Sequence, residues 1–426
     1  MVFIFLIQAA VILAAAQAFG RLVRRFGQPT VVGEIIAGLV LGPSLLGWLS
    51  PGVSAWLFPV ETVSTLNILG QLGLVLFMFL VGLRLDPKEL EEKRGKALLI
   101  SFGSIALPFA GGYALAIYLH PRVCGPNVPV TSFALFMGVA MSITAFPVLA
   151  RILRESGLLA TRLGSVAIAC AAVDDVSAWL ILAAILGFVR AGAHEHLAFG
   201  QTLLLLVAYL ALMLAMRPIW ARLVRSKAET SPGTPKLVPI LLFLLLSSSL
   251  TEWMGIHALF GAFFAGVVMP KDRRFIDTVG RIIEPLTATL ILPLFFALTG
   301  LRTRIGTVFN GKYLYYTLLI ILVAVAGKWL GAMISARFVC MSRRESNALG
   351  ILMNTRGLVE LVILNIGFEL GLLPPAVFSM MVLMALTTTV MTEPLLRWVY
   401  PKRLYATGEQ RQFDEISQQL SHADAV

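Results

Sequence analysis

Two adjacent aspartates, Asp174 and Asp175, lie in the middle of a long apolar segment, and Lys328 lies deep in another. An ionisable side chain at the centre of a membrane costs about 2.5–3.5 kcal/mol on insertion scales, so groups of this kind mark functional sites. Adjacent residues of a helix point about 100° apart. One carboxylate can therefore face an ion pathway while the other meets a fixed partner. A carboxylate that exchanges a proton for a cation is the minimum chemistry of ion antiport.

The alternative is an ion network that only holds helices together. Two neighbouring acids facing one lysine leave a net negative charge, which suits that purpose poorly. Like charges this close in a nonpolar surrounding repel strongly, so the pair is suited to exchanging protons. Asp174, Asp175 and Lys328 are therefore the candidate ion-binding and proton-carrying residues. Arg356 and Glu360 are spaced i,i+4 in one segment, and for them we expect a structural ion pair.

Two apolar segments contain polar runs that predict interrupted helices. One holds Ser142 and Thr144 just before Pro147, which lacks a backbone donor and disturbs the preceding turn. The other holds Asn354 in the run Asn-Thr-Arg-Gly. Transporters bind substrate at the midplane between interrupted helices. Ser142, Thr144 and Asn354 are therefore candidates for the ion pathway.

Composition indicates a membrane protein. The 426 residues are 58% hydrophobic and only 13% charged, against about 25% charged in soluble domains. The apolar residues form blocks of about 20, the length of helix that crosses a hydrocarbon core roughly 30 Å thick. Backbone groups in lipid must bond internally, so we predict an all-α polytopic fold. About 13 spans are expected, at roughly 2–20, 30–50, 63–83, 97–119, 130–151, 161–189, 199–221, 237–253, 256–270, 278–300, 313–336, 346–368 and 375–398.

Charge predicts the orientation of these spans. Most of the 34 lysines and arginines fall in connections that share one side if the N-terminus is outside, and positive loops face the cytoplasm. The C-terminus is then cytoplasmic, and we expect a multi-pass protein of the cell (inner) membrane whose first span is retained and not cleaved as a signal. The net charge of +11 belongs to the cytoplasmic face and does not indicate a nucleic-acid partner.

The two predicted interruptions fall in the fifth and twelfth spans, which are seven spans apart. Spans one to six would then repeat as spans eight to thirteen. Because seven is odd, the second copy enters the membrane upside down. We therefore predict two inverted-topology six-helix repeats with crossed broken helices.

Several runs of residues resemble the monovalent cation:proton antiporter-2 family, which includes sodium/proton antiporters, Kef-type potassium systems and plant cation/proton exchangers. The similarity covers the whole membrane region. The runs that carry it are 28–38, 77–83, 144–153, the segment around Asp174 and Asp175, and 354–367.

The resemblance implies a homodimer with an elevator-type alternating access mechanism. The antiporter membrane domain would occupy 1–400, followed by a short cytoplasmic tail at 401–426. Within it, a dimerisation part is expected at roughly 1–90 and 237–300, a mobile core at roughly 97–189 and 313–398, and a linker helix at roughly 199–221.

The resemblance also implies roles for the charged residues. Asp175 would be the main site for the transported Na⁺ and the proton, with Asp174 contributing to the site and pairing with Lys328. Exchange would be electrogenic. Kef-type members have a Gln-Asp pair and a nucleotide-binding domain, and this chain has Asp-Asp, so we expect no nucleotide-binding domain and no cofactor.

Other functions remain open at this point. Na⁺ is the expected cation, with Li⁺ or K⁺ as alternatives. A sodium-coupled symporter of related fold and a K⁺ efflux or K⁺:H⁺ system are the main rivals. An intramembrane aspartyl protease needs aspartates on two helices and a Gly-x-Gly-Asp motif, which this sequence lacks, so we expect no enzyme.

Overall fold

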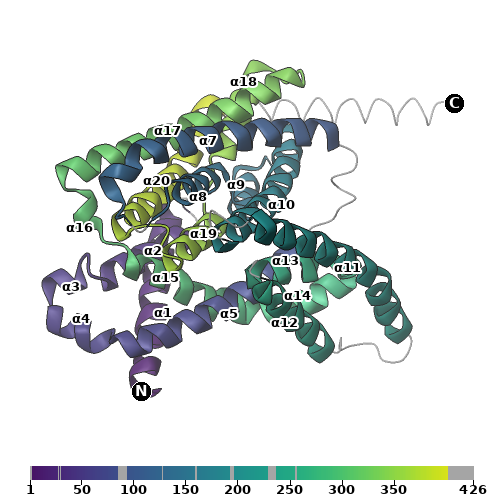
Figure 1. The fold of residues 1–426 in the computed structure, drawn as a ribbon, viewed down its shortest axis with the longest axis horizontal. Coiled ribbons are helices and arrows are strands. Elements are labelled where there is room, and N and C mark those ends of the chain that lie inside the picture. Colours follow the sequence, from purple (N-terminus) through teal and green to yellow (C-terminus); the bar gives the residue numbers. More distant parts are fainter. Residues whose placement is uncertain are drawn as a thin grey trace.

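The computed structural model describes residues 2–26, 28, 30–84, 94–126, 128–158, 161–191, 196–228, 237–254 and 257–401. Within these residues the fold is helical and contains no strand. Helices α7 and α17 run side by side along one edge of the molecule, with α8, α9, α19 and α20 beneath them (Figure 1). The expected tail from 402 onward, and part of the basic connection at 85–93, lie outside the described residues.

The helices of the first half follow one another with short connections. They are α1 (Val2–Arg25), α2 (Thr30–Leu41), α3 (Leu46–Leu49), α4 (Pro51–Leu57), α5 (Val60–Arg84), α7 (Arg94–Val123), α8 (Val130–Ser142), α9 (Phe146–Ser156), α10 (Arg162–Ala191) and α11 (His196–Ala228).

The second half has the same character, with one π-helical turn, η1. Its helices are α12 (Leu237–Trp253), α13 (Ala258–Val268), α14 (Arg273–Leu286), η1 (Thr287–Ile291), α15 (Leu292–Arg302), α16 (Ile305–Val308), α17 (Gly311–Phe338), α18 (Arg343–Met353), α19 (Leu358–Glu369) and α20 (Pro375–Val399).

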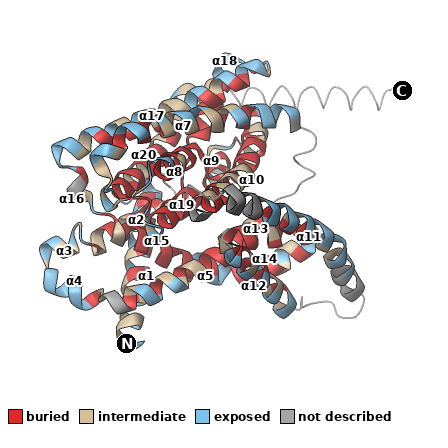
Figure 2. Ribbon diagram, viewed as in Figure 1, coloured by how far each residue is buried: buried red, intermediate tan, exposed pale blue. Residues whose placement is uncertain are grey.

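Nine helical stretches in the described part of the chain are long and apolar enough to cross a membrane. All thirteen predicted ranges overlap helices. The two numbers differ because the prediction of thirteen counted each interrupted pair as one span and included the short helices α12 and α13. Large apolar side chains such as Trp253 and Trp398, 78% and 81% exposed, lie on the outer surface, where a bilayer would cover them (Figure 2).

Both expected interruptions are present. Helix α8 ends at Ser142 and α9 begins at Phe146, and α18 ends at Met353 before α19 begins at Leu358. The backbone at Ile143 is extended, with φ −83° and ψ 142°. Pro147 is the second residue of α9, in the first turn of a helix, where its missing N–H leaves no bond unmade. The break therefore precedes the proline.

Glycines bring α7 and α17 close enough together to place Lys328 in the interior. A Cβ on Gly331 would lie 2.3 Å from the carbonyl oxygen of Gly103 on α7, and one on Gly327 would lie 2.9 Å from Cα of Pro108. Small residues four apart allow this backbone approach between membrane helices. Lys328 follows Gly327 directly and is fully buried.

The close approach gives a stability prediction. Gly331→Ala adds a methyl group where the Gly103 backbone already lies, so we expect a loss of about 1–3 kcal/mol, the usual cost of overpacking. It should appear as a lower apparent melting temperature of the detergent-solubilised protein. Gly95→Ala is the matched control, because nothing lies within 4 Å of a Cβ there. Equal melting temperatures for the two variants would contradict the close packing of α7 on α17.

Candidate ion-binding site

A buried ion pair joins α10 to α17 at the centre of the helix bundle. Lys328 Nζ lies 2.8 Å from Asp174 Oδ2, and both side chains are 0% exposed. The same ammonium group donates to the backbone carbonyl of Ser142, the last residue of α8. Lys328 therefore connects the first aspartate to the end of an interrupted helix.

The Oδ2 atom of Asp174 has further donors. The Thr144 hydroxyl lies 2.8 Å away and the Ser104 hydroxyl 3.4 Å away. Ser104 was missed in the sequence because a serine in an apolar helix is ordinary. The signal was its place beside Gly103, on the stretch of α7 that packs closely on α17. The other oxygen, Oδ1, is buried and finds no hydrogen-bond partner in the described part of the chain.

Asp175 faces a different surrounding. Its side chain is 2% exposed, and it is hydrogen-bonded to the backbone of Phe146, the first residue of α9. A helix N-terminus carries a partial positive charge and unpaired N–H groups, which favour a carboxylate. Its Oδ1 also has no protein partner within the described residues. The two aspartates thus meet different groups, one a fixed ammonium and the other a helix end.

Buried cations complete the hydrogen bonding at the end of α8. The last carbonyls of a helix have no partner within the helix, and in a dry interior each unpaired carbonyl is costly. Arg356 donates to the carbonyls of Ala140 at 3.0 Å and Met141 at 2.6 Å. Lys328 donates to that of Ser142. Arg356 is also paired with Glu360 at 3.1 Å, and both side chains are fully buried.

The two interruptions contact each other directly. The backbone N–H of Ala145 donates to the carbonyl of Thr355 at 2.9 Å. The Thr144 hydroxyl lies 3.0 Å from the carbonyl of Met353, the last residue of α18, as well as next to Asp174. One hydroxyl hydrogen cannot serve both acceptors at once. Several oxygen atoms therefore converge where the broken helices meet.

The three predicted pathway residues occupy different positions in this arrangement. Thr144 contacts Asp174 directly. Ser142 contacts Lys328 through its backbone carbonyl, while its hydroxyl donates to Val139 of its own helix at 2.9 Å. The amide of Asn354 donates to carbonyls of α17 and α18, and no hydrogen bond to either aspartate is among its bonds.

No group of three or more His, Cys, Asp or Glu side chains in the described residues is arranged to hold a metal ion. The site offers carboxylate, hydroxyl and backbone carbonyl oxygens instead. Carbonyl oxygens can replace part of the hydration shell of a small cation, so the arrangement suits an ion that binds and leaves.

These features define a class of protein: a polytopic membrane transporter for a small ion, with charged groups between interrupted helices. Residues 9–398 match the family described as "Sodium/hydrogen exchanger, transmembrane". The chain belongs to this family, and so it is a multi-pass membrane transporter and not an enzyme.

Relatives agree with this assignment. The chain is 42% identical over 395 residues to the Na⁺/H⁺ antiporter NhaS4 of Synechocystis, covering 92% of this chain and 96% of that protein. It is 30% identical over 434 residues to the K⁺/H⁺ antiporter 1 of Saccharomyces cerevisiae, covering 99% of this chain but 49% of that protein. The solved sodium/proton antiporter MjNhaP1 of Methanocaldococcus jannaschii has the same fold, with TM-score 0.67, 15% identity, and 93% and 96% of the two chains covered.

The buried pair gives a second stability prediction. Lys328→Gln leaves the carboxylate of Asp174 without its ammonium partner, so we expect a loss of about 3–5 kcal/mol, as for other broken buried pairs. The apparent melting temperature in detergent measures this. The double variant Lys328→Gln/Asp174→Asn removes both charges and should recover much of the loss. A double variant no more stable than Lys328→Gln alone would show that the pair does not stabilise the fold through charge.

Proposed function

We propose that the protein is a secondary active antiporter that exchanges a monovalent cation, Na⁺ foremost, for protons. The observation that carries this proposal is the Asp174–Lys328 pair beside a second buried carboxylate, Asp175, at the meeting point of two broken helices. The name of the cyanobacterial relative, a Na⁺/H⁺ antiporter, supports the choice of ion.

Asp175 carries the cation in one half of the cycle and a proton in the other. Its unpartnered Oδ1 can accept either. Thr144, and the carbonyls freed by the interruptions, would complete the coordination of the cation together with Asp174. Ser142 and Asn354 shape this pathway mainly through the backbone that they hold in place.

Lys328 supplies the second proton. When the site is empty, its ammonium group stays paired with Asp174; when a cation binds, Asp174 turns to the cation and Lys328 releases a proton. Two protons then move for each monovalent cation, and net charge crosses the membrane. Arg356 and Glu360 keep the end of α8 in place and take no part in the proton exchange.

The packing supports the proposed pair of inverted repeats within a thirteen-span fold. In that scheme α2 corresponds to α13, α5 to α15, and α7 to α17. Helix α2 packs on α15, α5 packs on α13, and α7 packs on α17, which is the pattern that a two-fold relation requires. We place the dimerisation part and the mobile core of an elevator mechanism in the segments given above, in a homodimer in the cell membrane with a cytoplasmic C-terminus.

A K⁺:H⁺ system is the second candidate. The yeast relative carries that name, and the oxygen ligands around Asp175 do not by themselves select a cation size. Selectivity is measured in proteoliposomes by adding Na⁺, Li⁺ and K⁺ in turn while a trapped dye reports pH. Uptake of an organic solute with Na⁺, and no proton movement, would instead support a symporter.

Asp175→Asn tests the main carrier. The substitution keeps the size and removes the charge, so cation-induced proton movement should fall to the level of empty liposomes, while the protein remains folded and monodisperse. Glu393→Gln is the control, because Glu393 is nearly as buried but pairs with Arg397 in its own helix, and it should transport normally. Wild-type exchange by Asp175→Asn would refute the assignment.

A voltage clamp tests the two-proton scheme. With the membrane potential set by potassium and valinomycin, the Na⁺ ratio at which proton flux reverses should shift with voltage in the wild type. Lys328→Gln should make the reversal point independent of voltage, or stop exchange. If the wild-type reversal point ignores voltage, exchange is one-for-one and Lys328 serves only to tether α8.

A further inference from the structure

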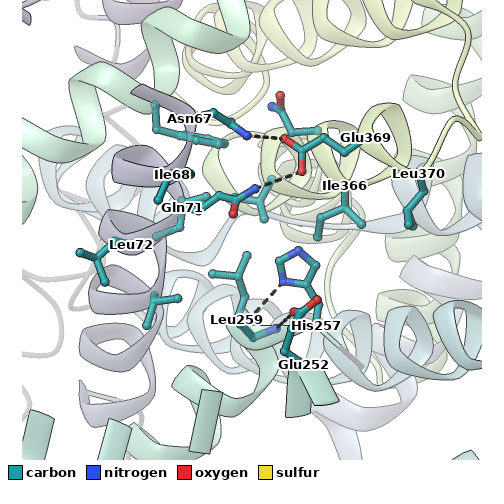
Figure 3. Close-up of a pocket in the computed structure, with 16 residues that line it drawn as sticks. Asn67, Ile68, Gln71, Leu72, Glu252, His257, Leu259, Ile366, Glu369 and Leu370 are labelled. Carbon is teal, nitrogen blue, oxygen red and sulfur yellow. Dashed lines mark hydrogen bonds between the residues drawn. The ribbon is translucent and has the colours of Figure 1, made fainter. Parts of the chain in front are cut away.

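A polar cluster lies at one end of the bundle, away from Asp174 and Asp175. Its centre is Glu369, the last residue of α19. Oxygen Oε1 accepts from Asn67 at 3.1 Å and from Arg302 at 3.0 Å, and Oε2 accepts from Gln71 at 3.1 Å. Figure 3 shows the two amides of α5 reaching the same carboxylate.

The cluster extends one turn along α19. Arg302, at the end of α15, also donates to Asn365 at 2.8 Å. Asn365 in turn donates to Thr299 of α15 at 2.9 Å. Residues 365 and 369 are i,i+4 neighbours on one helix face, so α19 meets both α5 and α15 through charged and polar groups in defined geometry.

These contacts cross the boundary proposed between the dimerisation part and the core. Helices α5 and α15 lie in the former and α19 in the latter. A cavity of about 500 Å³ opens beside the cluster and is lined from both sides, by Leu72 and Phe295 as well as Ile366. Towards the other end, the boundary between α2 and α19 is lined by apolar side chains such as Val32, Ile35 and Leu361.

Apolar surfaces can slide past each other with little preference for one register, because the hydrophobic effect has no direction. Hydrogen bonds weaken steeply when distance or angle departs from the optimum. The cluster can therefore form in one end position of the core and must break before the core reaches the other. Arg302 and Glu369 are only 19% and 31% exposed, so solvent screens this pair less than a surface pair.

We propose that Glu369 is a latch: with Arg302, Asn67 and Gln71 it holds the core in one end state and thereby sets the balance between the two access states. This inference rests on the proposed antiport by a moving core, and it assigns to Glu369 a positioning role distinct from ion binding. A ligand's apparent affinity depends on the fraction of protein in the state that binds it. Loss of the latch must therefore raise the apparent cation affinity on one side of the membrane and lower it on the other.

The first experiment cross-links the latch. Asn67→Cys/Glu369→Cys is made in the full chain with Cys124 and Cys340 replaced by serine, reconstituted, and treated with a short bifunctional thiol reagent. Proton exchange should be lost on treatment and return when a cleavable reagent is reduced. Gly70→Cys/Phe295→Cys is the matched control, because it joins α5 to α15 within the dimerisation part, where the Cβ separation is 3.5 Å. Cross-linking this pair should leave exchange intact. Persistent exchange by the cross-linked latch pair overturns the proposal.

The second experiment needs no cross-link. Glu369→Gln is assayed in everted and in right-side-out vesicles, and the apparent cation affinities from the two faces should shift in opposite directions by several-fold. Arg302→Gln should give the same shift, and the double variant no further shift. Glu284→Gln removes an ion pair with Arg84 that lies within the dimerisation part, and should change neither affinity.

The outcomes separate the two levels of the argument. Equal losses of rate from both faces with unchanged affinities would show a structural role for Glu369 and refute the latch. Absence of any cation-driven proton movement in the parent protein, with Na⁺, Li⁺ and K⁺ all tried, would refute the proposed antiport itself.

Discussion

The structure depends on how the end of α8 is satisfied inside the bundle. A helix that stops in a dry interior presents carbonyls that water cannot reach, and each costs free energy unless a donor is supplied. Here two cations supply the donors: Arg356 binds the carbonyls of Ala140 and Met141, and Lys328 binds that of Ser142. Each cation then needs an acid, and Glu360 and Asp174 are those acids. The broken helix and the buried charges are one interdependent unit.

The same requirement separates a structural pair from a pair suited to transport. Arg356 and Glu360 balance each other in charge on one helix, and Arg356 remains at the end of α8. Lys328 faces two aspartates, so the charge around it does not balance. Protons or a cation must supply the difference, because an uncompensated charge in a low-dielectric interior is expensive. Antiport is the chemistry that this imbalance allows.

The remaining helices hold that unit at its depth. Glycines allow α7 and α17 to approach at backbone distance, which places Lys328 opposite Asp174 and Ser142. Similar close contacts join α2 to α15 through Gly38 and Gly300, and α5 to α13 through Gly82 and Gly266. Such interfaces are rigid because a side chain of any size would separate the backbones. The boundary at α19 is different, with apolar side chains along its length and the Glu369 cluster at one end.

The sequence by itself determined the membrane class, the approximate spans, both interruptions and the residues whose charge is costly in lipid. These depend on local composition: 20 apolar residues must be a spanning helix, and a polar run inside one must break it. The sequence also indicated that Asp174 and Asp175 would have different surroundings, because neighbours on a helix diverge.

Only the tertiary structure decided which group each charge meets. Nothing in the sequence brings Thr144 and Ser104 to the carboxylate of Asp174, or places Arg356 on the carbonyls of α8 more than two hundred residues earlier. The role of Asn354 shows the same limit, since its amide binds carbonyls of α17 and α18 and not the aspartates. Glu369 was not singled out, because a charged residue at a helix end is ordinary until the fold sets it against α5 and α15. Pairings of this kind depend on how closely helices approach, and that distance is set by packing across the whole bundle.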